Sequence, residues 1–71
     1  MIILYSTDGC HLCEDAQALL DQVAVSYQVT DIIDDETLVA RYGTTIPVVA
    51  DSQGNELNWP FSLEQLRSFL D

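Results

Sequence analysis

Two cysteines, Cys10 and Cys13, are the residues of this chain whose type and spacing point most directly to chemistry. They lie between an apolar run at residues 2–6 and a helical pattern that begins at about His11. Unpaired backbone N–H groups and the helix dipole at a first helical turn favour a thiolate there. A second thiol three residues later can reach back and resolve a mixed disulfide. The pattern predicts thiol–disulfide exchange, with Cys10 as the nucleophile and Cys13 as the resolving thiol.

Other interpretations of the cysteine pair are a static disulfide, two buried structural thiols, or part of a metal site. Cys10, Cys13 and His11 would supply three ligands, whereas a closed structural zinc site needs four. The sequence has no second Cys-x-x-Cys and no other histidine, so we expect no metal ligands within one chain. A metal or iron–sulfur cluster shared between two chains stays open. Redox chemistry is favoured because Cys-x-x-Cys between a first strand and a first helix is the more specific signal.

The spacing of apolar residues predicts the elements that position this motif. Strands are expected at residues 2–6, 25–33, 47–50 and 56–59, and helices at 11–23, 35–42 and 63–70. Asp8 or Gly9 is expected to cap the first helix, Asp34-Asp35 the second, and Ser62 the third. Gly43 is expected to end the second helix. A right-handed crossover and a closing hairpin then give one α/β domain over 1–71, with a four-stranded mixed sheet and the order β-α-β-α-β-β-α.

The charge of the chain excludes several classes of partner. It has 12 Asp and Glu against 2 Lys and Arg, a formal net charge of −10. Nucleic acids and anionic membranes are bound through Lys and Arg, so neither is an expected partner. The apolar N-terminal run lacks the features of a signal peptide, so we expect the reducing cytoplasm, where paired cysteines are more often reactive than structural. The excess negative charge can be explained by solubility alone. A functional interpretation is that it selects a partner with a basic surface.

Two segments resemble the glutaredoxin and thioredoxin family: Tyr5-Ser6-Thr7-Asp8-Gly9-Cys10-His11-Leu12-Cys13 and Tyr42-Gly43-Thr44-Thr45-Ile46-Pro47. With the element order, the resemblance covers nearly the whole chain and is closest to short glutaredoxin-like proteins of bacteria. It implies a thioredoxin-like fold, a redox-active Cys10 and Cys13, and a cis Ile46–Pro47 bond that faces them. It also implies that Thr45, Ile46 and Pro47 bind substrate, with the Ile46 backbone pairing with the backbone of a thiol peptide.

The chain departs from glutaredoxins at three places. Thr7 stands where a lysine is typical, His11-Leu12 replaces Pro-Tyr between the cysteines, and residues 58–62 lack the Gly-Gly pair that holds glutathione. Glutathione is anionic, and Asp8, Glu14 and Asp15 add negative charge around the motif, so glutathione stays an open question as the partner. These acids would raise the pKa of the Cys10 thiol, whereas a protonated His11 would lower it, and His11 could equally be a solvated side chain without a role.

The sequence as a whole predicts a glutaredoxin-like thiol–disulfide oxidoreductase. We expect a monomer that acts on protein or small-molecule thiols and disulfides and needs no organic cofactor. One alternative is a non-catalytic thioredoxin-fold adaptor whose acidic surface binds a basic protein. A less favoured alternative is a metal or iron–sulfur carrier.

Overall fold

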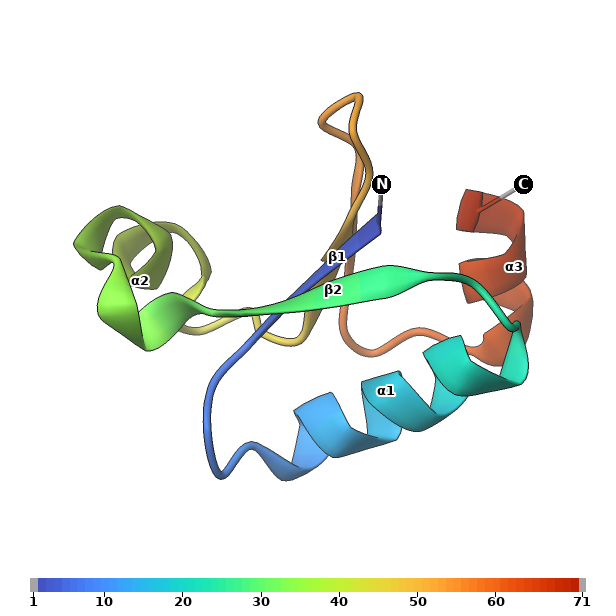
Figure 1. Cartoon of the computed structure of the whole chain (residues 1–71), viewed down its shortest axis with the longest axis horizontal. Helices are drawn as coiled ribbons and strands as arrows, with labels where there is room; N and C mark the ends of the chain where they lie inside the picture. The colour runs from blue at the N-terminus through green and yellow to red at the C-terminus, as the bar shows by residue number, and fades with distance from the viewer. Residues whose placement is uncertain (1, 71) are drawn as a thin grey trace.

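The computed structural model describes residues 2–70, which form four strands, three α-helices and one short 3₁₀ helix (Figure 1). In chain order these are β1 (Ile2–Ser6), α1 (His11–Gln22), β2 (Tyr27–Asp31), η1 (Ile32–Asp34), α2 (Glu36–Tyr42), β3 (Val48–Ala50), β4 (Glu56–Asn58) and α3 (Leu63–Leu70). The predicted order is confirmed, with η1 as an addition. Within residues 2–70, no helix has the length and apolar character needed to cross a membrane.

The strands of residues 2–70 form one mixed sheet in the order β2-β1-β3-β4. The central strand β1 pairs in parallel with β2, so that Leu4 lies opposite Val29 and Ser6 lies opposite Asp31. On its other side β1 pairs antiparallel with β3, which in turn pairs antiparallel with β4. This four-stranded mixed sheet with its three α-helices confirms the predicted fold class.

Each face of the sheet carries its own apolar cluster. One cluster joins β1 and β3 to α1 and α3 and contains Leu4, Ala16, Leu20, Val49, Phe61 and Leu66. The other joins β3 to η1 and α2 and contains Ile32, Tyr42 and Val48. Successive residues of a strand point to opposite faces, which explains how Val48 and Val49 belong to different clusters. Helices α1 and α3 therefore cover one face and α2 the other, and this packing fixes the start of α1 near the carboxyl end of β1.

The second predicted strand, residues 25–33, is wrong at both ends. β2 begins at Tyr27 and ends at Asp31, and Ile32 and Ile33 belong to η1. The physical reason lies at Asp31, whose carboxylate accepts a hydrogen bond from the Ile33 N–H (3.0 Å). An aspartate that bonds the backbone two residues further on favours a turn over extended chain, despite the β-branched residues that follow.

Helix α2 begins and ends where the sequence predicts, but Gly43 ends it for a different reason than expected. Asp35 is its N-cap, as expected, with a carboxylate that accepts the N–H groups of Thr37 (2.9 Å) and Leu38 (3.4 Å). Gly43 ends the helix with an ordinary right-handed φ of −53°, and not in the left-handed conformation of a glycine cap. Glycine fits there because a Cβ at this position would lie 2.5 Å from the Val39 carbonyl oxygen.

Helix α3 begins with the capping box that the sequence predicts. The Ser62 hydroxyl accepts the Gln65 N–H (3.1 Å), and the Gln65 side-chain oxygen accepts the Ser62 N–H (2.8 Å). We expect Ser62→Ala to lower the free energy of unfolding by about 1 kcal/mol, because one helical N–H loses its acceptor. Urea denaturation followed by circular dichroism measures this. The control is Ser68→Ala, an exposed position of α3 outside the cap, and an equal loss in both variants would contradict the capping role.

Candidate functional site

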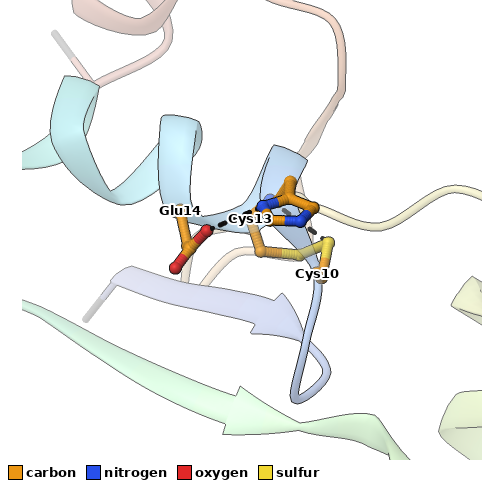
Figure 2. Close-up of polar contacts among 4 residues, drawn as sticks. Cys10, Cys13 and Glu14 are labelled. Carbon is orange, nitrogen blue, oxygen red and sulfur yellow. Dashed lines mark hydrogen bonds and ion pairs between the residues drawn. A yellow bond between two sulfur atoms is a disulfide. The ribbon is translucent and has the colours of Figure 1, made fainter.

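Cys10 and Cys13 form a disulfide at the first turn of α1, as Figure 2 shows. Their Cα atoms are 5.3 Å apart. Cys10 is itself the N-cap of α1, with an extended backbone (φ −88°, ψ 107°), so the expectation that Asp8 or Gly9 caps the helix is wrong. The Cys13 N–H donates a hydrogen bond to the Cys10 sulfur (3.2 Å), which takes the place of a capping oxygen. This N–H donor at the helix start would also stabilise a negative charge on the Cys10 sulfur.

The two sulfurs differ in their access to solvent. Cys13 is buried, with 4% of its surface exposed, whereas Cys10 is half-buried. Gly9, with a φ of +78°, turns the chain between the end of β1 and Cys10, and this left-handed conformation suits a residue without a Cβ. The loop thus presents Cys10 to solvent and leaves Cys13 beneath it.

His11 and Glu14 form the one ion pair within residues 2–70, between His11 Nδ1 and a Glu14 carboxylate oxygen (3.2 Å). Both side chains are strongly exposed, at 96% and 73%. The imidazole therefore lies in solvent with a carboxylate partner. Glu14 competes with the Cys10 sulfur for any positive charge on His11, which weakens the expected influence of His11 on that sulfur.

Thr45, Ile46 and Pro47 lie at the same end of the sheet as the cysteine loop. The β1–β3 register pairs Tyr5 with Val48, so Pro47 falls one residue beyond, beside Ser6. The Ile46–Pro47 peptide bond is cis, and Pro47 is fully buried. The N–H groups of Thr45 (2.9 Å) and Ile46 (3.1 Å) both donate to the Tyr42 carbonyl oxygen, which fixes the turn before β3.

Tyr42, whose carbonyl accepts these two N–H groups, packs on the face of the sheet that α2 covers. Its ring stacks on that of Tyr5, with centroids 4.5 Å apart, and its hydroxyl donates a hydrogen bond to the Glu56 carboxylate. Burial, together with the hydrogen bond to Glu56 and the charge of Glu56, raises the pKa of Tyr42 to about 12. Burial raises the pKa of Tyr27 as well, where the partner is Asp21.

The raised pKa of Tyr42 predicts how stability changes in alkali. The folded protein holds the phenolic proton more tightly than the unfolded chain, whose tyrosines titrate at about 10. The stabilisation is therefore complete below pH 10 and is lost as the pH rises from about 10 to about 12. We expect the free energy of unfolding to fall more steeply across this window in the natural protein than in Tyr42→Phe. Urea denaturation at a series of pH values measures this. If the free energy of unfolding fell equally steeply with pH in both proteins, the assignment would be contradicted.

A cavity of about 380 Å³ opens directly beside the disulfide. Its lining includes Cys10, Cys13 and three acidic residues, Asp8, Glu14 and Asp31. Thr45, Ile46 and Pro47 do not line it, so the predicted substrate residues occupy a different side of the cysteine loop. Within residues 2–70, no group of three or more His, Cys, Asp or Glu side chains is arranged to hold a metal ion.

Ser6 and Asp31 also line this cavity, and neither was predicted from the sequence to be a site residue. The sequence does carry a signal for Ser6, because a serine interrupts an apolar strand at the position that shares a face with Leu4. Asp31 carries no comparable signal. Only the parallel register of β1 and β2 brings it next to Ser6.

Fold and site together define a small α/β protein of the thioredoxin-like class, with a Cys-x-x-Cys pair at its first helix. Among solved structures, protein XcR50 from X. campestris matches with a TM-score of 0.94 and 42% identity, over 100% of this chain and 96% of that chain. Protein Ne2328 from Nitrosomonas europaea matches with a TM-score of 0.84 and 25% identity, over 99% and 89%. Thioredoxin 1 from Thermosipho africanus shares the fold, with a TM-score of 0.58 and 20% identity over 97% and 92%.

The chain belongs to the glutaredoxin-like domain family (DUF836), whose model matches residues 1–71. This confirms the resemblance to glutaredoxin-like proteins of the thioredoxin superfamily. A search of curated proteins finds no match.

Proposed function

We propose that the protein is a thiol–disulfide oxidoreductase that uses Cys10 as the nucleophile and Cys13 as the resolving thiol. The observation that carries this is the hydrogen bond from the Cys13 N–H to the half-buried Cys10 sulfur at the first turn of α1. A backbone donor and a helix N-terminus both stabilise a thiolate, which is the reactive form. The buried Cys13 lies within bonding distance and is protected from other reagents.

In the reduced protein, the Cys10 thiolate attacks one sulfur of a substrate disulfide. The substrate S–S bond breaks, and the departing thiolate takes a proton from solvent. Cys13 then loses its proton and attacks the Cys10 sulfur, which releases the second substrate thiol. The substrate gains two electrons and two protons in all, and the protein is left with the Cys10–Cys13 disulfide that the structure contains. A thiol reductant reverses these steps on the protein.

Thr45, Ile46 and Pro47 are assigned to bind the backbone of a thiol peptide, as the resemblance implies. The Ile46 N–H already donates to Tyr42, so the Ile46 carbonyl is the backbone group that we assign to the substrate. We assign protein and small-molecule disulfides as substrates, a monomer as the active form, and the reducing cytoplasm as the compartment. No organic cofactor enters the reaction.

A trapping experiment tests the proposal. Reduced Cys13→Ser is incubated with 2-hydroxyethyl disulfide and analysed by intact mass spectrometry. Because the resolving thiol is absent, we expect the protein to accumulate as a mixed disulfide with one mercaptoethanol on Cys10. Reduced Cys10→Ser is the matched control and should form the adduct far more slowly, through the buried Cys13 alone. A Cys10 that stays unmodified near neutral pH would contradict the proposal and favour a non-catalytic adaptor.

A further inference from the structure

The cavity beside the disulfide lies between the first turns of α1 and the carboxyl end of β2. Ser6 of β1 and Asp31 of β2 are direct partners in the parallel register, so their side chains lie on the same face of the sheet. That face is the one covered by α1, since Leu4, two residues before Ser6, packs in the α1 cluster. The side chains of Ser6 and Asp31 therefore reach the cavity from the floor, and Cys10 and Glu14 border it from the loop and the helix.

Ser6 has an unused hydrogen-bonding group at this floor. Only 6% of its surface is exposed, and the side-chain hydrogen bonds of residues 2–70 include none to its hydroxyl. No side-chain oxygen or nitrogen that is completely buried in residues 2–70 lacks a partner. The Ser6 oxygen is therefore not completely buried, and Ser6 lines the cavity, where its hydroxyl can accept a hydrogen bond from a bound group.

The charges around the cavity all have one sign. Asp8, Glu14 and Asp31 line it, and neither of the two arginines of the chain, Arg41 and Arg67, does. One Asp31 oxygen accepts the Ile33 N–H (3.0 Å), and the other has no hydrogen bond within residues 2–70. Carboxylates with unused lone pairs beside a hydroxyl acceptor suit a donor-only cation such as an ammonium or guanidinium group.

We propose that this acidic cavity binds the ammonium or guanidinium group of a disulfide substrate, so that the protein selects cationic disulfides over neutral and anionic ones. The inference rests on the proposed function and names its substrate class. The bound cation takes no part in the electron transfer. It holds the substrate sulfur near Cys10 and stabilises the negative charge that moves from the Cys10 thiolate to the departing substrate sulfur.

Three disulfides of similar length and different charge test this. They are cystamine, which carries two ammonium groups, neutral 2-hydroxyethyl disulfide, and 3,3′-dithiodipropionate, which carries two carboxylates. The rate constant of the reduced protein with each is divided by that of dithiothreitol, which removes differences in leaving-group acidity. We expect the normalised rate to be highest for cystamine, intermediate for 2-hydroxyethyl disulfide and lowest for dithiodipropionate. Each cavity carboxylate that contacts the ammonium group should contribute about a two- to fivefold difference in rate. The three normalised rates should approach one another as salt is added.

Variants locate the selectivity. The ratio of cystamine to dithiodipropionate rates cancels any change in Cys10 reactivity, because both reactions use the same thiolate. We expect Asp31→Asn and Glu14→Gln each to lower this ratio about two- to fivefold. The single variant Ser6→Ala should lower the ratio as well. Asparagine can still cap η1 in place of Asp31, so the fold is retained. The matched control is Asp15→Asn, which removes the same charge from α1 at an exposed position outside the cavity.

The outcomes separate this inference from the proposed function. Reaction with none of the three disulfides would overturn both. Reaction with all three at equal normalised rates would overturn the cation site and leave the proposed function intact. The same result follows if Asp15→Asn lowers the ratio as much as Asp31→Asn, since the selectivity would then come from the overall charge. A ratio lowered by the cavity variants alone supports the site.

Discussion

Replacement of Cys10 by serine is expected to lower the rate of disulfide reduction by about a thousandfold or more. A serine hydroxyl is not ionised near neutral pH, and the backbone donor at the helix start then has no thiolate to stabilise. The measurement is the rate at which the reduced protein consumes 2-hydroxyethyl disulfide. In the natural protein, this rate should rise with pH as the Cys10 thiol ionises and then reach a plateau.

Cys13→Ser separates the two thiols. It should retain the first attack, release one mercaptoethanol per protein, and then stop, because no internal thiol resolves the adduct. If Cys13→Ser were inactive in the first step while Cys10→Ser retained it, the roles of the two cysteines would be reversed. Equal activity of both variants would show that either thiol can make the first attack. That result would contradict the assignment of Cys10 as the nucleophile, which rests partly on the burial of Cys13.

The largest expected loss of stability comes from Leu20→Ala in α1. Leu20 is fully buried in the cluster that joins α1 and α3 to the sheet. Its truncation removes apolar contacts and leaves a cavity, so we expect the free energy of unfolding to fall by about 3 kcal/mol. In a chain of 71 residues this is a large part of the total. Urea denaturation of the oxidised protein, with the midpoint and slope fitted together, measures the change.

Leu12→Ala is the matched control on the same helix. Leu12 is 48% exposed, so the same truncation should change the free energy of unfolding by no more than about 0.5 kcal/mol. If the two variants were equally destabilised, α1 would not pack against the sheet by the face that contains Leu20. Should Leu20→Ala be largely unfolded even without urea, far-ultraviolet circular dichroism would show it directly, and the sign of the prediction would stand.

Much of the fold follows from local signals in the sequence. The apolar spacing placed each main element, and the Ser62 and Asp35 caps are present as predicted. The errors occur where a side chain competes with propensity. Asp31 bonds the backbone ahead of it and turns Ile32 and Ile33 away from the strand that their β-branched side chains favour.

The site was predictable only in part, because its pieces come from distant segments. Cys10 and Cys13 are three residues apart and carry their own signal. The cavity beside them needs Ser6 and Asp31 to meet, and that depends on the register of two parallel strands. The sequence predicts acidic residues around the cysteines, but sequence spacing does not fix such a register, so the cavity that Ser6 and Asp31 complete could not be predicted.

The most direct test of the redox function is the reduction equilibrium of the Cys10–Cys13 disulfide. The protein is equilibrated without oxygen in dithiothreitol buffers of graded potential, and the free thiols are alkylated and counted by mass spectrometry. A catalytic pair should titrate reversibly as one two-electron couple with a potential above about −300 mV, within reach of cellular thiol reductants. A disulfide that stays oxidised until well below that value would be a structural crosslink and would contradict the proposed function.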